Sequence, residues 1–132
     1  AGKPSWYRKL TYGNKTMKRI DFKNVSDLVD MLDAATIAVN YHYGRLKDYD
    51  AEDVHKYFLI RQVKAASVQE HLLRAEVNFA RYARDKKISE KCNSSVYAAD
   101  AKVHKAQGEA SMARAEQAKR EYAEADAKWV NA

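Results

Sequence analysis

The sequence predicts an all-α protein, and three observations carry that prediction. Helix-breaking residues are rare, with four Gly and one Pro among 132 residues. Hydrophobic residues make up 46% of the chain, enough to bury a modest core. Along two long stretches they return every three or four residues, which is the period of a helix. We therefore expect an elongated three-helix arrangement, with helices near residues 26–43, 51–85 and 95–130 and the last two forming an antiparallel hairpin.

Residues 1–23 are predicted to form an extended basic arm, distinct from a helical domain at residues 24–132. The arm holds seven Lys or Arg residues and one acid, Asp21, whereas the rest of the chain has 17 residues of each charge. The whole net charge of +6 therefore lies in the arm. Its aromatic side chains need a surface to cover them, so we expect the arm to lie either on its own helical bundle or on a partner. The predicted partner-binding residues are Trp6, Tyr7, Arg8, Lys9, Tyr12, Lys15, Lys18 and Arg19.

The first predicted helix begins near Asn24 or Ser26, either of which is a suitable N-cap. Acids follow in its early turns, where the helix dipole favours negative charge. Gly44 is predicted to end this helix, and Asp50 to cap the next one. One face of the first helix is apolar and consists of Leu28, Met31, Leu32, Ala35 and Val39.

The second predicted helix carries two neighbouring apolar stripes. Together they form a face roughly 100° wide, too broad for a two-stranded coiled coil and suited to a central helix that contacts two others. Arg61 and Glu70 interrupt the stripes and are expected at the edge of the buried face. The first stripe is Val54, Phe58, Arg61, Ala65, Val68, Leu72, Ala75, Phe79 and Tyr82, and the second is Leu59, Val63, Ala66, Glu70, Leu73, Val77 and Ala80.

Residues 85–95 are predicted to connect the two long helices, with Ser89, Asn93 or Ser94 capping the last one. From Val96 onward the chain has 12 Ala in 37 residues, which lets another helix approach closely while burying little area. The expected buried stripe of this helix is Val96, Ala99, Val103, Ala106, Ala110 and Ala113, continuing through Ala118, Tyr122, Ala125 and Trp129.

The sequence predicts no catalytic residue, no metal site and no cofactor. Glu52 and His55 have the Glu-x-x-His spacing of di-iron bundles, but the second copy that such a site needs is missing. His42 lies between two Tyr residues near Gly44, which favours an aromatic cluster closing the end of the bundle over an acid–base site. Tyr49 and Tyr57 are expected nearby. No glycine-rich phosphate loop or nucleophile elbow is present, so we expect a non-enzymatic protein.

A single cysteine, Cys92, excludes an internal disulfide and favours a reducing, intracellular compartment: cytosol, organelle matrix or virion interior. Three glycosylation sequons begin at Asn14, Asn24 and Asn93, and we interpret them as chance matches in a protein that is not secreted. No apolar run approaches the roughly 20 residues that cross a bilayer, so no transmembrane segment is expected.

These features lead to two hypotheses about function. The first is a structural or assembly subunit of a larger multi-protein complex, which docks through the basic arm and the apolar helix stripes. The alternative is a nucleic-acid-binding accessory protein of phage or organellar type, whose arm contacts phosphates and stacks on bases. Other protein subunits are thus the first expected partners, followed by nucleic acid or another acidic or anionic surface. Oligomerisation is compatible with both hypotheses.

Overall fold

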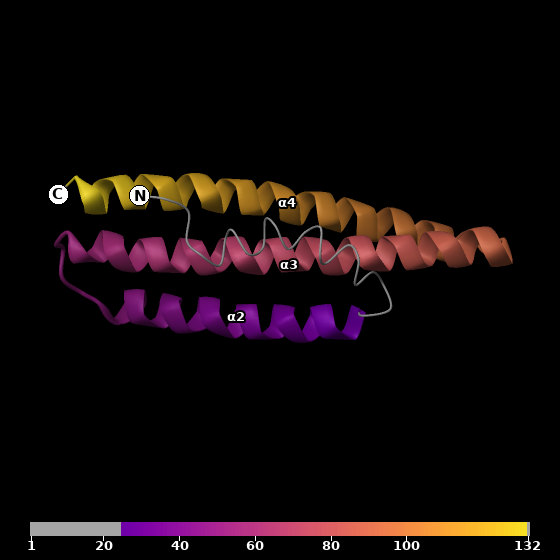
Figure 1. Ribbon diagram of the computed structural model, residues 1–132, viewed down its shortest axis with the longest axis horizontal. Helices are drawn as coiled ribbons and strands as arrows, with labels where there is room; N and C mark the ends of the chain where they lie inside the picture. Colours follow the sequence, from indigo (N-terminus) through magenta and orange to yellow (C-terminus); the bar gives the residue numbers. More distant parts are fainter. Residues whose placement is uncertain (1–24, 132) are drawn as a thin grey trace.

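The computed structural model describes residues 25–131, and this part of the chain consists of three helices (Figure 1). Helix α2 spans Val25–Asp48, α3 spans His55–Cys92 and α4 spans Ser95–Val130. No strand occurs within these residues. The all-α prediction is therefore confirmed. The predicted arm, with all eight of its predicted partner-binding residues, lies outside the described residues.

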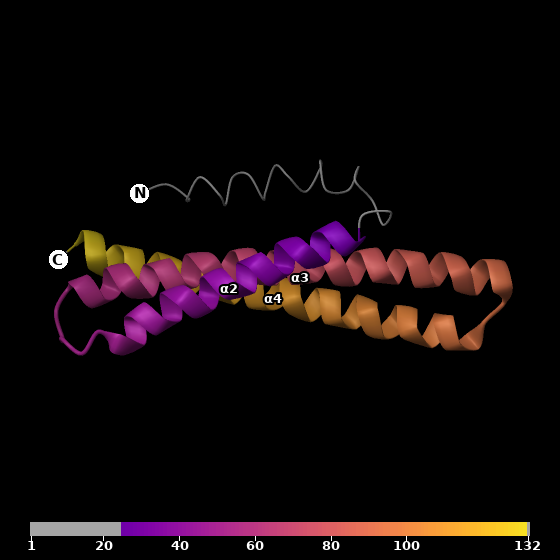
Figure 2. The ribbon, with the colours of Figure 1, turned by 90° about the horizontal axis from the view of Figure 1, so that it is seen from below.

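Helix α3 is the central helix of the molecule. It packs against α2 on one side and α4 on the other, whereas within residues 25–131 no Cα atom of α2 lies within 8 Å of a Cα atom of α4 (Figures 1 and 2). Helices α3 and α4 run antiparallel along nearly their whole length and form the predicted hairpin. At about 1.5 Å per residue, α3 is on the order of 57 Å long, so the arrangement is elongated.

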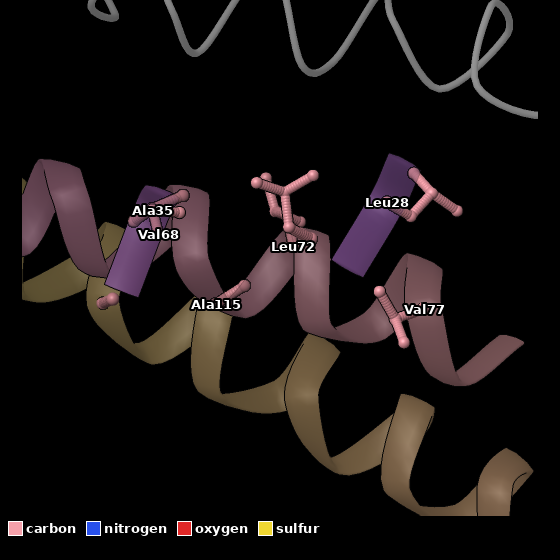
Figure 3. Packing of buried hydrophobic residues seen from close by; sticks show 8 residues of the cluster. Leu28, Ala35, Val68, Leu72, Val77 and Ala115 are labelled. Atoms are coloured by element: carbon pink, nitrogen blue, oxygen red, sulfur yellow. The ribbon is translucent and has the colours of Figure 1, made fainter. Parts of the chain in front are cut away.

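The two stripes predicted for α3 both contribute to the core, which confirms the broad buried face. Side chains of the first stripe meet those of the second in one cluster with α2 and α4. Figure 3 shows six of these residues from three helices, with Leu28 and Ala35 coming from α2 and Ala115 from α4. The buried α3 residues of the two stripes are Leu59, Val63, Ala66, Val68, Leu72, Leu73, Ala75 and Val77.

The stripe predicted to be buried in the first half of α4 faces solvent instead. Val96 and Val103 are 67% and 52% exposed, and the four Ala residues of the same stripe are exposed too. The reason is that α4 has small residues on several sides, and α3 packs against the side where the residues are smallest. The residues that face α3 are Ala101, Gly108, Ser111, Ala115, Ala118 and Ala125, so the predicted continuation of the stripe is right at Ala118 and Ala125.

The Phe79 ring of α3 packs directly against Gly108 of α4. A Cβ atom placed on Gly108 would lie 2.7 Å from Cε1 of Phe79, inside the normal contact distance between carbon atoms. Ala75 on α3 and Ala115 on α4 are both completely buried. The hairpin is thus held by close packing of small residues as well as by large apolar side chains.

The boundary between α2 and α3 differs from the prediction. Helix α2 continues through Gly44 to Asp48, because glycine weakens a helix by only about 1 kcal/mol and does not end it by itself. Asp50 does not cap α3. Instead Asp53 lies just before the helix, and its Oδ1 accepts hydrogen bonds from the His55 N–H (2.9 Å) and the Tyr49 hydroxyl (2.5 Å).

The connection between α3 and α4 is much shorter than the predicted residues 85–95. Helix α3 extends to Cys92, and Asn93 then adopts a left-handed conformation with φ 50° and ψ 46°, which asparagine tolerates. The Ser94 N–H donates to the Ser89 carbonyl at 3.1 Å, as in a Schellman motif. Ser94 then caps α4 by accepting from the Tyr97 N–H, which is one of the three caps predicted.

Candidate functional site

One candidate surface is an exposed apolar stripe on α4. We call it the outer stripe, and it consists of the six residues Val96, Ala99, Val103, Ala106, Ala110 and Ala113, all exposed. They alternate at steps of three and four, the spacing by which one helix packs on another. Since each residue turns a helix by about 100°, Ala106 lies roughly opposite Ala101, which is buried against α3. Helix α4 therefore has two apolar faces, of which one is covered.

Helix α2 also exposes large apolar side chains. Ile37 is 69% exposed, Tyr41 is 61% exposed and Tyr43 is 57% exposed. Only Leu28 and Ala35 of α2 are fully buried. The two outer helices of the arrangement thus both present large apolar groups to solvent, whereas α3 exposes none, and Val54 just before it is 39% exposed.

An aromatic cluster joins the start of α3 to the end of α4. The His55 ring stacks on Phe58 at 5.4 Å between centroids, and Trp129 lies 5.2 Å from Phe58 and 6.0 Å from His55. Tyr49 contacts the other side of His55 at 5.4 Å. The cluster predicted around His42 is therefore wrong. Tyr41 and Tyr43 are exposed, His42 has an edge contact with Tyr41, and of the predicted members only Tyr49 joins the cluster that is built around His55. The Tyr49–Asp53 hydrogen bond raises the pKa of Tyr49 to about 12.

Ion pairs cross the α3–α4 interface on either side of its middle. Arg61 Nη1 lies 2.7 Å from Asp126 Oδ1, so the charged interruption of the first stripe pairs with the neighbouring helix. Lys64 pairs with Glu121 at 3.1 Å. Towards the hairpin turn, the buried carboxylate of Asp85 lies 2.8 Å from His104 Nδ1. Because each contact joins one residue of α3 to one of α4, together they help to fix the register of the hairpin.

A groove of about 410 Å³ lies between these ion pairs, where α2, α3 and α4 leave a space. Three arginines are among the residues that line it: Arg74 and Arg81 from α3 and Arg114 from α4. We call it the arginine groove. Sequence reasoning missed it, although the seven-residue spacing of Arg74 and Arg81 places both on one face of a helix. Its other lining residues are Leu32, Val77, Asn78, Gln107, Ala110 and Ser111.

His71 lies near the groove arginines and has a lowered pKa. Burial is the main cause, and the positive charges of Arg74 and Arg114 add to it, while Glu70 acts in the opposite direction. The Nδ1 atom of His71 is buried without a hydrogen-bond partner. The imidazole is therefore held in its neutral form at a pH where a free histidine would begin to gain a proton.

The low pKa of His71 predicts a specific loss of stability in mild acid. In the unfolded chain this histidine takes up a proton near pH 6.5, whereas the folded protein binds it only at lower pH. The free energy of unfolding should therefore fall as the pH drops from 7.5 through 6.5. Urea denaturation at pH 7.5 and 5.5 should show a smaller fall for His71→Gln than for the parent chain. Equal falls in both proteins would contradict this assignment.

The remaining chemistry-bearing residues do not converge. No group of three His, Cys, Asp or Glu residues within residues 25–131 could hold a metal ion. In the Glu-x-x-His element, Glu52 pairs with Lys56 at 2.8 Å while His55 belongs to the aromatic cluster. Cys92 is exposed at the hairpin turn. No helix in the described part of the chain is long and apolar enough to cross a membrane.

The chain matches no protein-family model, no curated protein and no solved structure. Its function therefore has to be argued from its own residues.

Proposed function

We propose that this chain is a non-enzymatic structural or assembly subunit of a larger protein complex. The observation that supports this best is the outer stripe of α4, an apolar helix face with regular heptad spacing that α2 and α3 leave exposed. A helix that is apolar on two opposite faces is typical of a helix packed between two layers. The partner in this proposal is another protein subunit that lays a helix along α4.

The composition of the outer stripe favours a close helix–helix contact. Four of its six residues are Ala, which lets a second backbone approach, and Val96 and Val103 supply the larger buried area. The six positions extend over about 26 Å of helix. The exposed Ile37 and Tyr41 on α2 and the aromatic residues of the arm offer further apolar area for the same assembly. In this proposal the lone cysteine, exposed as Cys92, fits a reducing intracellular compartment.

Two lysines in the outer stripe should dissociate the assembly without unfolding the subunit. Ala99 and Val103 are both exposed, so Ala99→Lys/Val103→Lys should change the free energy of unfolding by only about 0.5 kcal/mol per site. In a complex, the same charges would be buried unpaired, which costs several kcal/mol. Native purification with quantified stoichiometry should recover a defined complex for the parent chain and the free subunit for this variant.

The matched control is Ala123→Lys/Ala127→Lys, which adds the same two charges four residues apart at exposed positions on another side of α4. This control should keep the stoichiometric complex. Retention of the complex by the stripe variant, or a parent chain that remains a partner-free monomer, would contradict the proposal.

The alternative function, nucleic-acid binding through the arm, is favoured by one observation: all of the net charge of +6 lies in residues 1–23, next to Trp6, Tyr7 and Tyr12. Such binding would weaken steeply with salt, because each phosphate contact releases counterions. If the parent chain alone bound oligonucleotides at low salt, and Arg8→Glu/Lys9→Glu abolished that binding, the alternative would be preferred.

A further inference from the structure

The arginine groove concentrates positive charge in the middle of the α3–α4 face. Arg74 and Arg81 lie two helical turns apart on α3, about 10 Å along the axis, and Arg114 faces the same space from α4. No Asp or Glu lines the groove within residues 25–131. The groove is thus a recess whose charged lining residues all carry the same sign.

Two of the three guanidinium groups have no counterion in the described part of the chain. Arg81 and Arg114 form no ion pair or hydrogen bond there, whereas Arg61 and Lys64 of the same hairpin each pair with an acid of α4. Arg74 has a partner in Glu70, but at 3.7 Å that contact is long for a charge-assisted hydrogen bond. Within residues 25–131, Arg81 and Arg114 are therefore available to a bound anion, and Arg74, which is paired with Glu70, adds positive charge beside them.

Two polar side chains in the walls of the groove are buried. Asn78 is only 7% exposed, and its side-chain N–H donates to the Arg74 carbonyl at 3.0 Å. Ser111, only 1% exposed, lies opposite on α4. Both come from the rigid middle of long helices, so the arginines project from a fixed frame. Burial is the main cause of the lowered pKa of His71, and Arg74 and Arg114 make smaller contributions in the same direction.

We propose that the arginine groove binds a short chain of phosphate groups, either free inorganic polyphosphate or the phosphate tail of a nucleotide. Guanidinium groups bind phosphate oxygens through paired hydrogen bonds, and three of them suit a ligand with several negative charges. A volume of about 410 Å³ is within the range of small-molecule sites. No aromatic residue lines the groove in the described part of the chain, so the base stacking that holds single-stranded nucleic acid is missing here. The inference does not rest on the proposed assembly, and its groove shares one residue, Ala110, with the outer stripe.

Isothermal titration of the full chain with sodium tripolyphosphate tests this proposal. The double variant Arg81→Gln/Arg114→Gln should bind at least about tenfold more weakly, since each charge-assisted hydrogen bond contributes to affinity. The amide NMR signals of Asn78 and Ser111 should shift on titration of the parent chain and not of this variant. Both arginines are without partners in residues 25–131, so the fold should be unaffected, and circular dichroism checks this.

The control is Lys87→Gln/Arg120→Gln, which removes the same two charges from exposed positions of α3 and α4 outside the groove. It should bind tripolyphosphate with parental affinity. Equal affinities for tripolyphosphate and ATP would assign the site to the phosphate chain alone, and tighter binding of ATP would identify a nucleotide as the source. The proposal is overturned if both double variants weaken binding equally, if neither does, if no binding occurs at millimolar ligand, or if an oligonucleotide shifts Asn78 and Ser111 at lower concentration than tripolyphosphate.

Discussion

Proline in place of Ala75 should unfold the hairpin. Ala75 is completely buried in the middle of α3, the helix on which both others pack. Proline removes a backbone N–H and its ring collides with the preceding turn, so the substitution should cost about 3 kcal/mol or more. The loss extends beyond α3, because α2 makes its helix–helix contacts with α3 alone within residues 25–131. Far-UV circular dichroism should show a large loss of helix, and thermal denaturation a much lower midpoint.

Ser95→Pro is the matched control for this prediction. Ser95 is the first residue of α4, where an N–H has no partner within the helix and proline is well tolerated. The preceding Ser94 has φ −99° and ψ 119°, the extended conformation that proline requires of the residue before it. The control should therefore keep the parental helix content. A helical signal that Ala75→Pro leaves intact would show that α3 is not a continuous packed helix.

Leucine in place of Gly108 should force the two long helices apart. Even a Cβ atom at this position would lie within 3 Å of three atoms of the Phe79 ring, and the leucine side chain adds three more carbons to the same interface. Overpacking of this kind destabilises by about 1–3 kcal/mol. Better helix propensity returns up to about 1 kcal/mol, so we expect a net loss of about 1 kcal/mol, measured by urea denaturation.

Gly44 provides the comparison for Gly108. It also lies inside a helix, but a Cβ atom placed on it meets nothing within 4 Å. Gly44→Leu should therefore stabilise the protein by up to about 1 kcal/mol through helix propensity alone. Opposite signs for the two substitutions would establish the close approach at Gly108. A stabilising Gly108→Leu would contradict it.

The sequence predicted the central helix well because the large residues of α3 lie on one broad face. Leu59, Val63 and Leu73 are buried as their spacing required, since no other face of α3 could bury a comparable area. A strong apolar pattern on one side leaves a single arrangement with a favourable free energy. Fold class and hairpin topology follow from such a pattern.

The buried face of α4 could not be predicted in the same way. Val96 and Val103 suggested that their stripe was the buried one, yet the contact with α3 is made by smaller residues. Which side of an alanine-rich helix packs depends on how closely the partner backbone approaches, and periodicity does not report this. The position of Gly108 opposite Phe79 decides it here, and that contact joins residues far apart in the sequence.

The helix ends and the candidate site also could not be predicted from residue types, because both depend on local geometry. Gly44 and Asp50 each had the residue type for an end or a cap, but Asp53 provides the actual hydrogen bond to the start of α3. The arginine groove could not be predicted without the register of α3 against α4, because Arg114 belongs to a different helix from Arg74 and Arg81. The predicted contact residues of the arm remain a prediction, and the exposed stripe of α4 now offers a second surface for the same proposed role.

Within the described residues, the backbone of α2 packs on α3 alone. The whole helix can therefore detach as one unit, which exposes its amide hydrogens to solvent. Its release would break one interface and leave the α3–α4 hairpin closed. Amide hydrogens of α2 should then exchange with deuterium before those in the middle of the hairpin, because local opening requires less free energy than global unfolding. Such an opening would uncover the side of α3 that packs against Leu28 and Ala35, giving an incoming helix a place to insert.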